Sequence, residues 1–334
     1  MGGVGMTIRR FVRALALAGM LPALMLPAGA SQGEPMVTKY GFYLDTVVAV
    51  SAYADEAVVE GALALCGDYE AILGKTREGS DVWNINRSAG EPVVVSDATL
   101  DILRLAAEVG EKTGGAFDIT VAPAVALWDF SGTGARLPDA EALRQAAERI
   151  DYRKVEIDGS AVRLPDGMQI DLGGIAKGYI ADRIADYLEQ NGVKSGLLNL
   201  GGNILTVGSK PGGSWKVGIQ DPFSATGEAK IAIFANDTSV VTSGVYERGF
   251  DLNGVRYHHL LDAQTGWPVQ NGLASVTIIA RESVMADALS TGAFALGLAD
   301  GMALVESLDG VEAIFITDRG KVALSSGAAG MVAR

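Results

Sequence analysis

The chain has 334 residues, of which 49% are hydrophobic and 20% are charged, which is enough apolar material for a packed core. Its 40 acidic and 27 basic side chains give a formal net charge of −13 at pH 7. We expect no nucleic-acid partner, because phosphate backbone is bound by basic surfaces. Cys66 is the only cysteine, which excludes an internal disulfide.

The N-terminal segment has the layout of a secretory signal. Three arginines precede an apolar run over 14–26, and the small residues over 28–30 resemble a cleavage site. A membrane anchor is the alternative, but prolines interrupt the run, which is shorter than the roughly 20 residues of a span. The stretch TIRRFVR over 7–13 loosely resembles a twin-arginine signal. We predict a signal peptide over 1–30, a mature domain over 31–334, a periplasmic location and no later membrane span.

The first half of the mature chain mixes strands and helices. Residues 46–53 alternate like a strand, and residues 56–73 have the period of an amphipathic helix. Ser96 is a suitable N-cap for a helix that runs to Lys112. The next expected elements are a polar loop over 74–92, a short helix over 138–150, a hairpin over 155–164, a strand over 168–172 and a helix over 175–190.

Short strands crowd the second half, and a long apolar helix follows them. The expected strands cover 196–200, 215–219, 229–234, 239–242, 256–261 and 274–280. We predict a helix over 285–298, a second helix after it, and a hairpin at 318–320. Strands mixed with helices favour an α+β fold over a doubly wound parallel sheet. We therefore expect one compact domain with mixed or antiparallel sheets and flanking helices.

Two polar side chains stand out in the predicted helix over 285–298. Asp287 and Thr291 are four positions apart, so they share one helix face. A carboxylate and a hydroxyl are the hard oxygen ligands that Mg²⁺ prefers, which indicates a metal-dependent enzyme of phosphate chemistry. The alternative is local: Thr291 bonding a carbonyl of its own helix, and Asp287 acting as a charge near the helix N-terminus.

A glycine-rich turn joins a predicted strand to a helix over 171–178, DLGGIAKG. Glycines let the backbone approach a ligand, and helix N-terminal amides favour anions. The turn is not a Walker A loop, because Gly178 follows Lys177 where Ser or Thr is needed. A tight structural turn with a solvated Lys177 is the alternative. A second glycine turn, over 200–203, is open to the same two interpretations.

His259 is one of only two histidines and is a candidate general base. A structural histidine is the alternative. Asp262 lies three positions further on, so in a strand the two side chains would point to opposite faces, and we expect no His–Asp relay. Asp118 follows a glycine pair and is either a buried acid that contacts a ligand or a capping residue.

Eight segments, taken in order, resemble the ApbE family of periplasmic flavin transferases (FAD:protein FMN transferases). They are SDVWNINRSAG, GGAFDITVAPAVALWDF, IDLGGIAKGYIADRI, LNLGGNI, WKVGIQDP, VVTSGVYERGF, RYHHLLDAQTGWPV and SVTIIARESVMADALSTGAFALG. The resemblance runs from Thr46 to about Ala323. Two departures occur: Leu44-Asp45-Thr46 stands where the family usually has Met-Gly-Thr, and Ala263-Gln264 stands where a proline often precedes the Thr-Gly pair.

The resemblance implies a site for FAD between the glycine turns and a Mg²⁺ ion beside it. The residues that it implies for contact with FAD are Leu44, Asn86, Ala116, Phe117, Asp118, Asp171, Lys177 and His259. It implies that Asp287, Thr291 and the backbone carbonyl of Gly174 hold Mg²⁺. His259 and Asp287 are the expected catalytic residues.

The implied reaction is Mg²⁺-dependent transfer of the FMN half of FAD to a Thr or Ser hydroxyl, with release of AMP. The acceptor would belong to an exported or membrane-bound redox complex. Two alternatives stay open from the sequence: an FAD pyrophosphatase, in which water replaces the acceptor, and a non-catalytic FAD carrier.

Overall fold

A computed structural model describes residues 35–130 and 136–333 of the chain. The signal peptide predicted over 1–30 lies outside the described residues and stays a prediction, as does the periplasmic location. From Pro35 onward the chain forms one compact unit.

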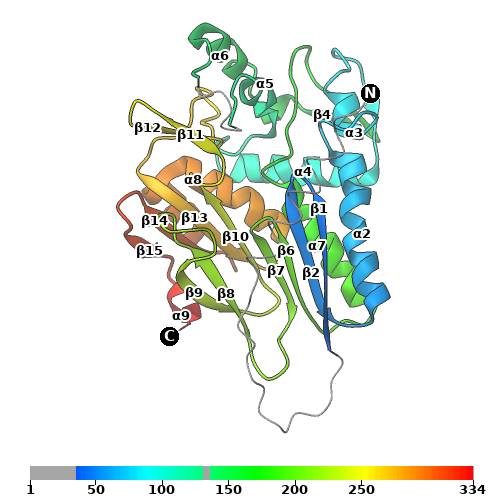
Figure 1. Ribbon diagram of the computed structural model, residues 1–334. Coiled ribbons are helices and arrows are strands. Elements are labelled where there is room, and N and C mark those ends of the chain that lie inside the picture. Colours follow the sequence, from blue (N-terminus) through cyan, green and yellow to red (C-terminus); the bar gives the residue numbers. More distant parts are fainter. Residues whose placement is uncertain (1–34, 131–135, 334) are drawn as a thin grey trace, which may run out of the picture. The chain divides into compact units, whose positions relative to one another are not determined.

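An eight-stranded sheet organises this unit, with strand order β1-β2-β6-β7-β10-β13-β14-β15 (Figure 1). Its strands are β1 (Met36–Tyr43), β2 (Thr46–Tyr53), β6 (Ser195–Leu200), β7 (Asn203–Gly208), β10 (Ser239–Gly244), β13 (Leu273–Ala280), β14 (Glu312–Thr317) and β15 (Val322–Leu324). All neighbouring strands in it are antiparallel. The α+β prediction is confirmed, and of its two sheet types the antiparallel one is present.

Small sheets and helices complete the unit. The small sheets are β3 (Val93–Val94) with β5 (Ala161–Arg163) and β4 (Glu156–Asp158); β8 (Trp215–Gln220) with β9 (Ala229–Ala235); and β11 (Gly249–Leu252) with β12 (Val255–His258). The helices are α2 (Glu56–Leu73), α3 (Asp81–Ile85), α4 (Asp97–Lys112), α5 (Ala122–Val125), α6 (Ala140–Ala147), α7 (Ala176–Gln190), α8 (Ser283–Glu306) and α9 (Ala328–Met331), with 3₁₀ turns η1 (Ile119–Val121) and η2 (Tyr152–Lys154).

The large sheet is covered on both faces, and β13 shows this most clearly because all its residues are buried. Val276 and Ile278 join the cluster that includes α8 side chains, whereas Ile279 joins the cluster of β8, β9 and α9. Successive strand residues point to opposite faces, so the helices pack on one face and the β8–β9 hairpin on the other. Helices α2 and α7 pack against β2, β6 and β7 in a third cluster.

Several predicted elements have the expected bounds. Helix α2 covers 56–73, and α4 begins after Ser96, whose Oγ accepts a hydrogen bond from the Thr99 N–H. Helix α7 buries Ile180 and Ile184, which fall on one face of the helix.

The prediction of a strand over 168–172 is wrong. The backbone of this segment bonds a side chain instead of a neighbouring strand: Asn86 Nδ2 donates to the Ile170 carbonyl (2.9 Å), and the Ile170 N–H donates to Asn86 Oδ1 (2.7 Å). The Asp171 N–H then donates to the Ile119 carbonyl (2.7 Å). The amide group supplies both hydrogen bonds that a ladder would give, so the segment is extended without belonging to a sheet. The loop predicted over 74–92 also contains a short helix, α3.

Helix α8 is interrupted at Gly297, whose backbone is non-helical (φ 84°, ψ −179°). Asn271 Nδ2 donates to the Phe294 carbonyl just before the kink (2.6 Å), so that group keeps a partner. Contrary to our expectation of no later span, α8 is long and apolar enough to cross a membrane. It nevertheless packs on β10, β13 and α7, and Asp287 is buried in it, as in the core helix of a globular protein.

Candidate active site between the glycine turn and helix α8

The candidate site forms where the start of α7 meets the first turns of α8. A Cβ atom on Gly178 would lie 2.2 Å from the Ser283 carbonyl oxygen, so the two backbones are in direct contact there. The Gly178 N–H donates to Asp287 Oδ2 (2.9 Å). Glycine is needed at this position for packing. The contact brings the 171–178 turn to the Asp287 carboxylate.

Asp287 is buried, with 4% of its surface exposed, and its charge is balanced within the site. Lys177 Nζ lies 3.6 Å from Asp287 Oδ1 and donates to the Gly173 carbonyl (3.2 Å). A buried carboxylate requires such partners, because an isolated one is strongly disfavoured away from water. Lys177 is therefore not simply a solvated helix residue, and Asp287 is more than a charge near the end of a helix.

Thr291 and Gly174, the other predicted Mg²⁺ ligands, are neighbours. A Cβ on Gly174 would lie 3.4 Å from Thr291 Oγ1 and 3.3 Å from the ring of Phe117. The Thr291 hydroxyl lies 3.3 Å from Ser243 Oγ in β10, so among the described residues its partner is a side chain and not a carbonyl of its own helix. Phe117 is buried. The structure thus brings five predicted residues to the α7–α8 junction: Phe117, Gly174, Lys177, Asp287 and Thr291.

These donors fit Mg²⁺. Asp287, Thr291 and the Gly174 carbonyl are all hard oxygen donors, and Asp287 Oδ1 lies 3.6 Å from Lys177 Nζ. Mg²⁺ is usually bound by one or two carboxylates, with substrate phosphates and water completing the octahedron. Within residues 35–130 and 136–333 no three His, Cys, Asp or Glu side chains cluster as a metal site.

Asp171 lies at the start of the same glycine turn. Its Oδ1 accepts from the Gly173 N–H (2.9 Å), and its Oδ2 forms an ion pair with Lys75. The first bond fixes the shape of the turn, and the second brings another cation to it. Sequence reasoning missed Lys75, which lies in a polar loop where a lysine is unremarkable.

Asn86 and Asp118 use their polar atoms within the protein. Asn86 bonds both backbone groups of Ile170, as described above. Asp118 Oδ1 accepts from the Thr120 N–H (2.7 Å) and hydroxyl (2.6 Å), and Oδ2 accepts from the Tyr152 N–H (2.8 Å). Burial raises the pKa of Asp118 above its usual value, although these hydrogen bonds oppose the shift. The capping role weighed from the sequence is present, and contact of either residue with FAD stays a prediction.

Two hairpin turns lie side by side at one end of the large sheet. Leu44 and Asp45 connect β1 to β2 and both have positive φ (53° and 57°), as a type I′ turn requires. Gly201 and Gly202 connect β6 to β7, and a Cβ on Gly201 would lie 2.5 Å from Thr46 Oγ1. The second turn is therefore a hairpin in close contact with the first. Leu44 is half-buried there.

His259 follows β12 and lies close enough to Arg248 and Lys177 to interact with their charges. Its Nδ1 is 3.3 Å from the Arg248 carbonyl oxygen. Burial lowers the pKa of His259 to about 4, and the charges of Arg248 and Lys177 act in the same direction. Asp262 instead accepts from the backbone N–H groups of Gln264 (2.7 Å) and Thr265 (3.0 Å). Asp262 thus shapes its own turn, and His259 bonds a carbonyl, so no His–Asp relay is present.

Three further residues of this region were not found from the sequence. Ser243 contacts Thr291, Glu247 interacts electrostatically with Lys177, and Asp182 bonds the first N–H groups of α8. Burial raises the pKa of Glu247 above its usual value. Their roles depend on contacts between distant segments, so no local pattern could identify them. Ala116 lies in the turn before Phe117, where its N–H donates to the Thr113 carbonyl (3.2 Å).

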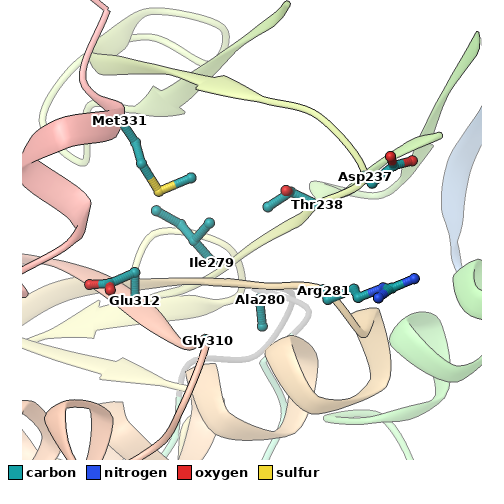
Figure 2. A pocket seen from close by; sticks show the side chains of 8 residues that line it. All are labelled: Asp237, Thr238, Ile279, Ala280, Arg281, Gly310, Glu312 and Met331. Atoms are coloured by element: carbon teal, nitrogen blue, oxygen red, sulfur yellow. The ribbon is translucent and has the colours of Figure 1, made fainter. Parts of the chain in front are cut away.

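One surface pocket contains none of the predicted residues. It measures about 420 Å³ and is lined by Asp237, Thr238, Ile279, Ala280, Arg281, Gly310, Glu312 and Met331. Figure 2 shows Met331 and Ile279 facing each other while Arg281 extends away from them. Its charged groups do not converge, so this pocket is a poor candidate for a phosphate site. A smaller pocket, about 210 Å³, includes Asn86.

Comparison with known proteins identifies the family of the chain. A model of the ApbE family matches residues 44–315. The FAD:protein FMN transferase of Treponema pallidum (strain Nichols) is 36% identical over 336 residues, covering 92% of this chain and 93% of that protein. The chain belongs to the ApbE family. A second relative of this ApbE protein, the FAD:protein FMN transferase of Klebsiella pneumoniae (strain 342), is 37% identical and covers 81% of the chain and 86% of its own length.

Solved structures of ApbE proteins have the same fold. The crystal structure of the ApbE protein from Thermotoga maritima superposes with a TM-score of 0.83 at 32% identity, covering 90% of this chain and 100% of that one. The apo form of the flavinyl transferase ApbE from Pseudomonas stutzeri gives 0.79 at 29% identity, with 89% and 96% covered. The family resemblance found in the sequence is confirmed.

Proposed function

We propose that this chain is an FAD:protein FMN transferase that uses Mg²⁺ and acts on an exported acceptor protein. The acceptor hydroxyl of Thr or Ser attacks the phosphorus of the FMN half. A new O–P bond forms, the pyrophosphate P–O bond breaks, AMP leaves with the bridging oxygen, and the hydroxyl proton passes to a base. The observation that carries the proposal is the meeting of Asp287, Thr291 and the Gly174 turn beside Lys177.

Charge supports this assignment. The chain has a net charge of −13, yet the substrate is a pyrophosphate anion, so the site needs local positive potential. Lys177 and Lys75 bring two cations to the glycine turn, and the N-terminus of α7 adds its backbone dipole. Mg²⁺ held by Asp287, Thr291 and the Gly174 carbonyl would neutralise phosphate charge in the transition state.

The protein's own part is mainly to position the reacting groups. The Gly178 N–H fixes one oxygen of Asp287 and leaves Oδ1 facing Lys177. Phosphoryl transfer depends on such positioning, because the enzyme does little covalent chemistry itself. His259 is the proposed base: burial keeps it unprotonated at neutral pH, so it can accept the hydroxyl proton. Its pKa is low for a base, and a bound pyrophosphate anion would raise it.

The deciding experiment mixes the protein, without residues 1–30, with FAD, Mg²⁺ and a protein that carries the acceptor hydroxyl. A mass gain equal to covalent FMN, abolished by EDTA, is expected together with AMP. AMP and free FMN without a mass gain would indicate the pyrophosphatase. Bound FAD with no AMP would indicate the carrier.

A matched pair of variants tests the site itself. Asp287→Ala should lose Mg²⁺ binding and nearly all transfer, whereas Asp300→Ala, on the exposed side of the same helix, should keep both. Normal Mg²⁺-dependent transfer by Asp287→Ala would contradict the proposed metal site.

The periplasmic location is part of the same proposal and rests on the signal-like segment over 1–30. Fractionation of cells that make the full chain should recover a shortened protein outside the cytoplasm. Substitution of the paired arginines at positions 9 and 10 should stop export only if the twin-arginine route is used. A full-length cytoplasmic product would contradict the proposal.

A further inference from the structure

The predicted Mg²⁺ ligands come from two segments that are far apart in the sequence, the turn before α7 and the helix α8. Gly174 precedes α7, whereas Asp287 and Thr291 belong to α8. The distance between the Gly174 carbonyl and the Asp287 carboxylate is therefore set by how α7 and α8 pack. Any group that fixes this packing controls the geometry of the metal site.

Asp182 is such a group. It lies in α7, and its two oxygens accept the N–H groups that begin α8: Oδ1 accepts from Ser283 (2.8 Å) and Oδ2 accepts from Val284 (2.8 Å). Glu282, at the N-cap position of α8, makes no side-chain cap. The first turn of α8 is thus capped from another helix, and both carboxylate oxygens are used.

A buried polar network anchors the same turn from the sheet. Ser283 Oγ donates to Asn203 Oδ1 in β7 (2.8 Å), and Ser239 Oγ in β10 donates to Ser283 Oγ (2.8 Å). All three side chains are almost fully buried. Burial raises the pKa of Asp182 to about 6, and the two N–H bonds oppose this shift, so the carboxylate is still mainly charged at neutral pH.

The cap and the metal ligand lie one helical turn apart on both helices. Gly178 contacts Asp287, and Asp182, four residues later, bonds Ser283 and Val284. Gly178 also packs on the backbone of Ser283 and Val284, so Asp182 adds two hydrogen bonds that hold this same first turn of α8 against α7. The Gly178 N–H holds one oxygen of Asp287, and Asp182 holds the turn of α8 from which Asp287 extends.

We infer that Asp182 is a positioning residue for the Mg²⁺ site, acting through the first turn of α8 on Asp287 and Thr291. The inference rests on the proposed function for the identity of the metal. Removal of a group that orients a metal ligand typically weakens metal binding by about 10- to 100-fold. Among the described residues, Asp182 is hydrogen-bonded to Ser283 and Val284, not to the predicted metal ligands.

The test is a calorimetric titration of Mg²⁺ into the FAD-loaded protein. Asp182→Ala should weaken Mg²⁺ binding by about 10- to 100-fold. Asp182→Asn keeps its size and one accepting oxygen, so a smaller loss is expected, and this variant serves if Asp182→Ala fails to fold. The matched control is Asp186→Ala on the same helix, where the carboxylate pairs with Arg183 near the surface, and Mg²⁺ binding should be unchanged.

Two further measurements separate positioning from general stability. FAD affinity in EDTA should be the same in all variants, and the amides of Ser283 and Val284 should exchange faster with solvent in both Asp182 variants. Unchanged Mg²⁺ affinity with faster amide exchange would show a purely structural cap and overturn the inference. Absence of Mg²⁺ binding by the unaltered chain would refute the proposed metal site itself, and the inference with it.

Discussion

Gly178→Ala is the sharpest test of the α7–α8 contact. The added Cβ would lie 2.2 Å from the Ser283 carbonyl oxygen and 2.7 Å from Val284 Cα. Because non-bonded carbon contacts are optimal at about 3.5–4.0 Å, the helices must separate by roughly 1 Å. The obstructing atoms are backbone, so no side-chain rotation can relieve the clash.

Two opposing terms set the expected change in stability. Overpacking of a tight contact costs about 1–3 kcal/mol, while the better helix propensity of alanine returns up to about 1 kcal/mol. We therefore expect the free energy of unfolding to fall by about 1–2 kcal/mol. The effect on activity should be larger: a displacement of about 1 Å at Asp287 can reduce the transfer rate by about 100-fold.

The assay combines urea denaturation with the rate of FMN transfer at saturating FAD. Gly330→Ala in α9 is the matched control, because its Cβ would meet no atom within 4 Å and both quantities should stay near those of the unaltered chain. A Gly178→Ala protein that is as stable and as active as the unaltered chain would refute the rigid contact between the two helices.

Three other outcomes follow from buried groups. Burial lowers the pKa of His258 to about 4, so the folded state keeps it neutral, and its contribution to stability above pH 6.5 should fall by up to about 3 kcal/mol as the pH drops to 4. A urea midpoint that changes between pH 7.5 and 4.5 by the same amount in His258→Phe as in the unaltered chain would contradict this. Burial raises the pKa of Cys66 to about 12, so a thiol reagent at pH 8 should label it only in urea, and labelling of the native protein would show that the site opens. Asn86→Ala leaves both backbone groups of the fully buried Ile170 without these partners and should destabilise by about 1–3 kcal/mol in the same assay, whereas Asn84→Ala should have little effect.

The sequence predicted those elements whose ends are set locally. Helix α4 has its own N-cap, Ser96, and α2 has a continuous apolar period, so their bounds could be read directly. The segment over 168–172 was misjudged because its hydrogen-bond partner is the Asn86 side chain, about 84 positions away and outside any pattern of alternation. Strand β7 was missed because the glycine turn before it could equally be a ligand loop.

In the candidate site, too, the features set by local sequence could be predicted, and those set by contacts between distant segments could not. The four-residue spacing of Asp287 and Thr291 on one helix is a local property, and it correctly placed both side chains at one junction. The ion pair between Lys177 and Asp287 depends on a close approach of α7 and α8 that only a glycine allows. Capping by Asp182 is likewise a contact between helices, so no sequence motif in either helix predicts it.

The bond from Gly178 to Asp287 joins positions 109 residues apart, and it has a consequence for the order of events during synthesis. A chain that has emerged only as far as α7 contains Asp171, Gly174 and Lys177 but has no carboxylate opposite them. Contacts of such long range form late in folding, since the intervening chain must first be ordered. If the proposed site is correct, metal and flavin would bind only after the C-terminal third has docked, so occupancy of the site would report completed folding.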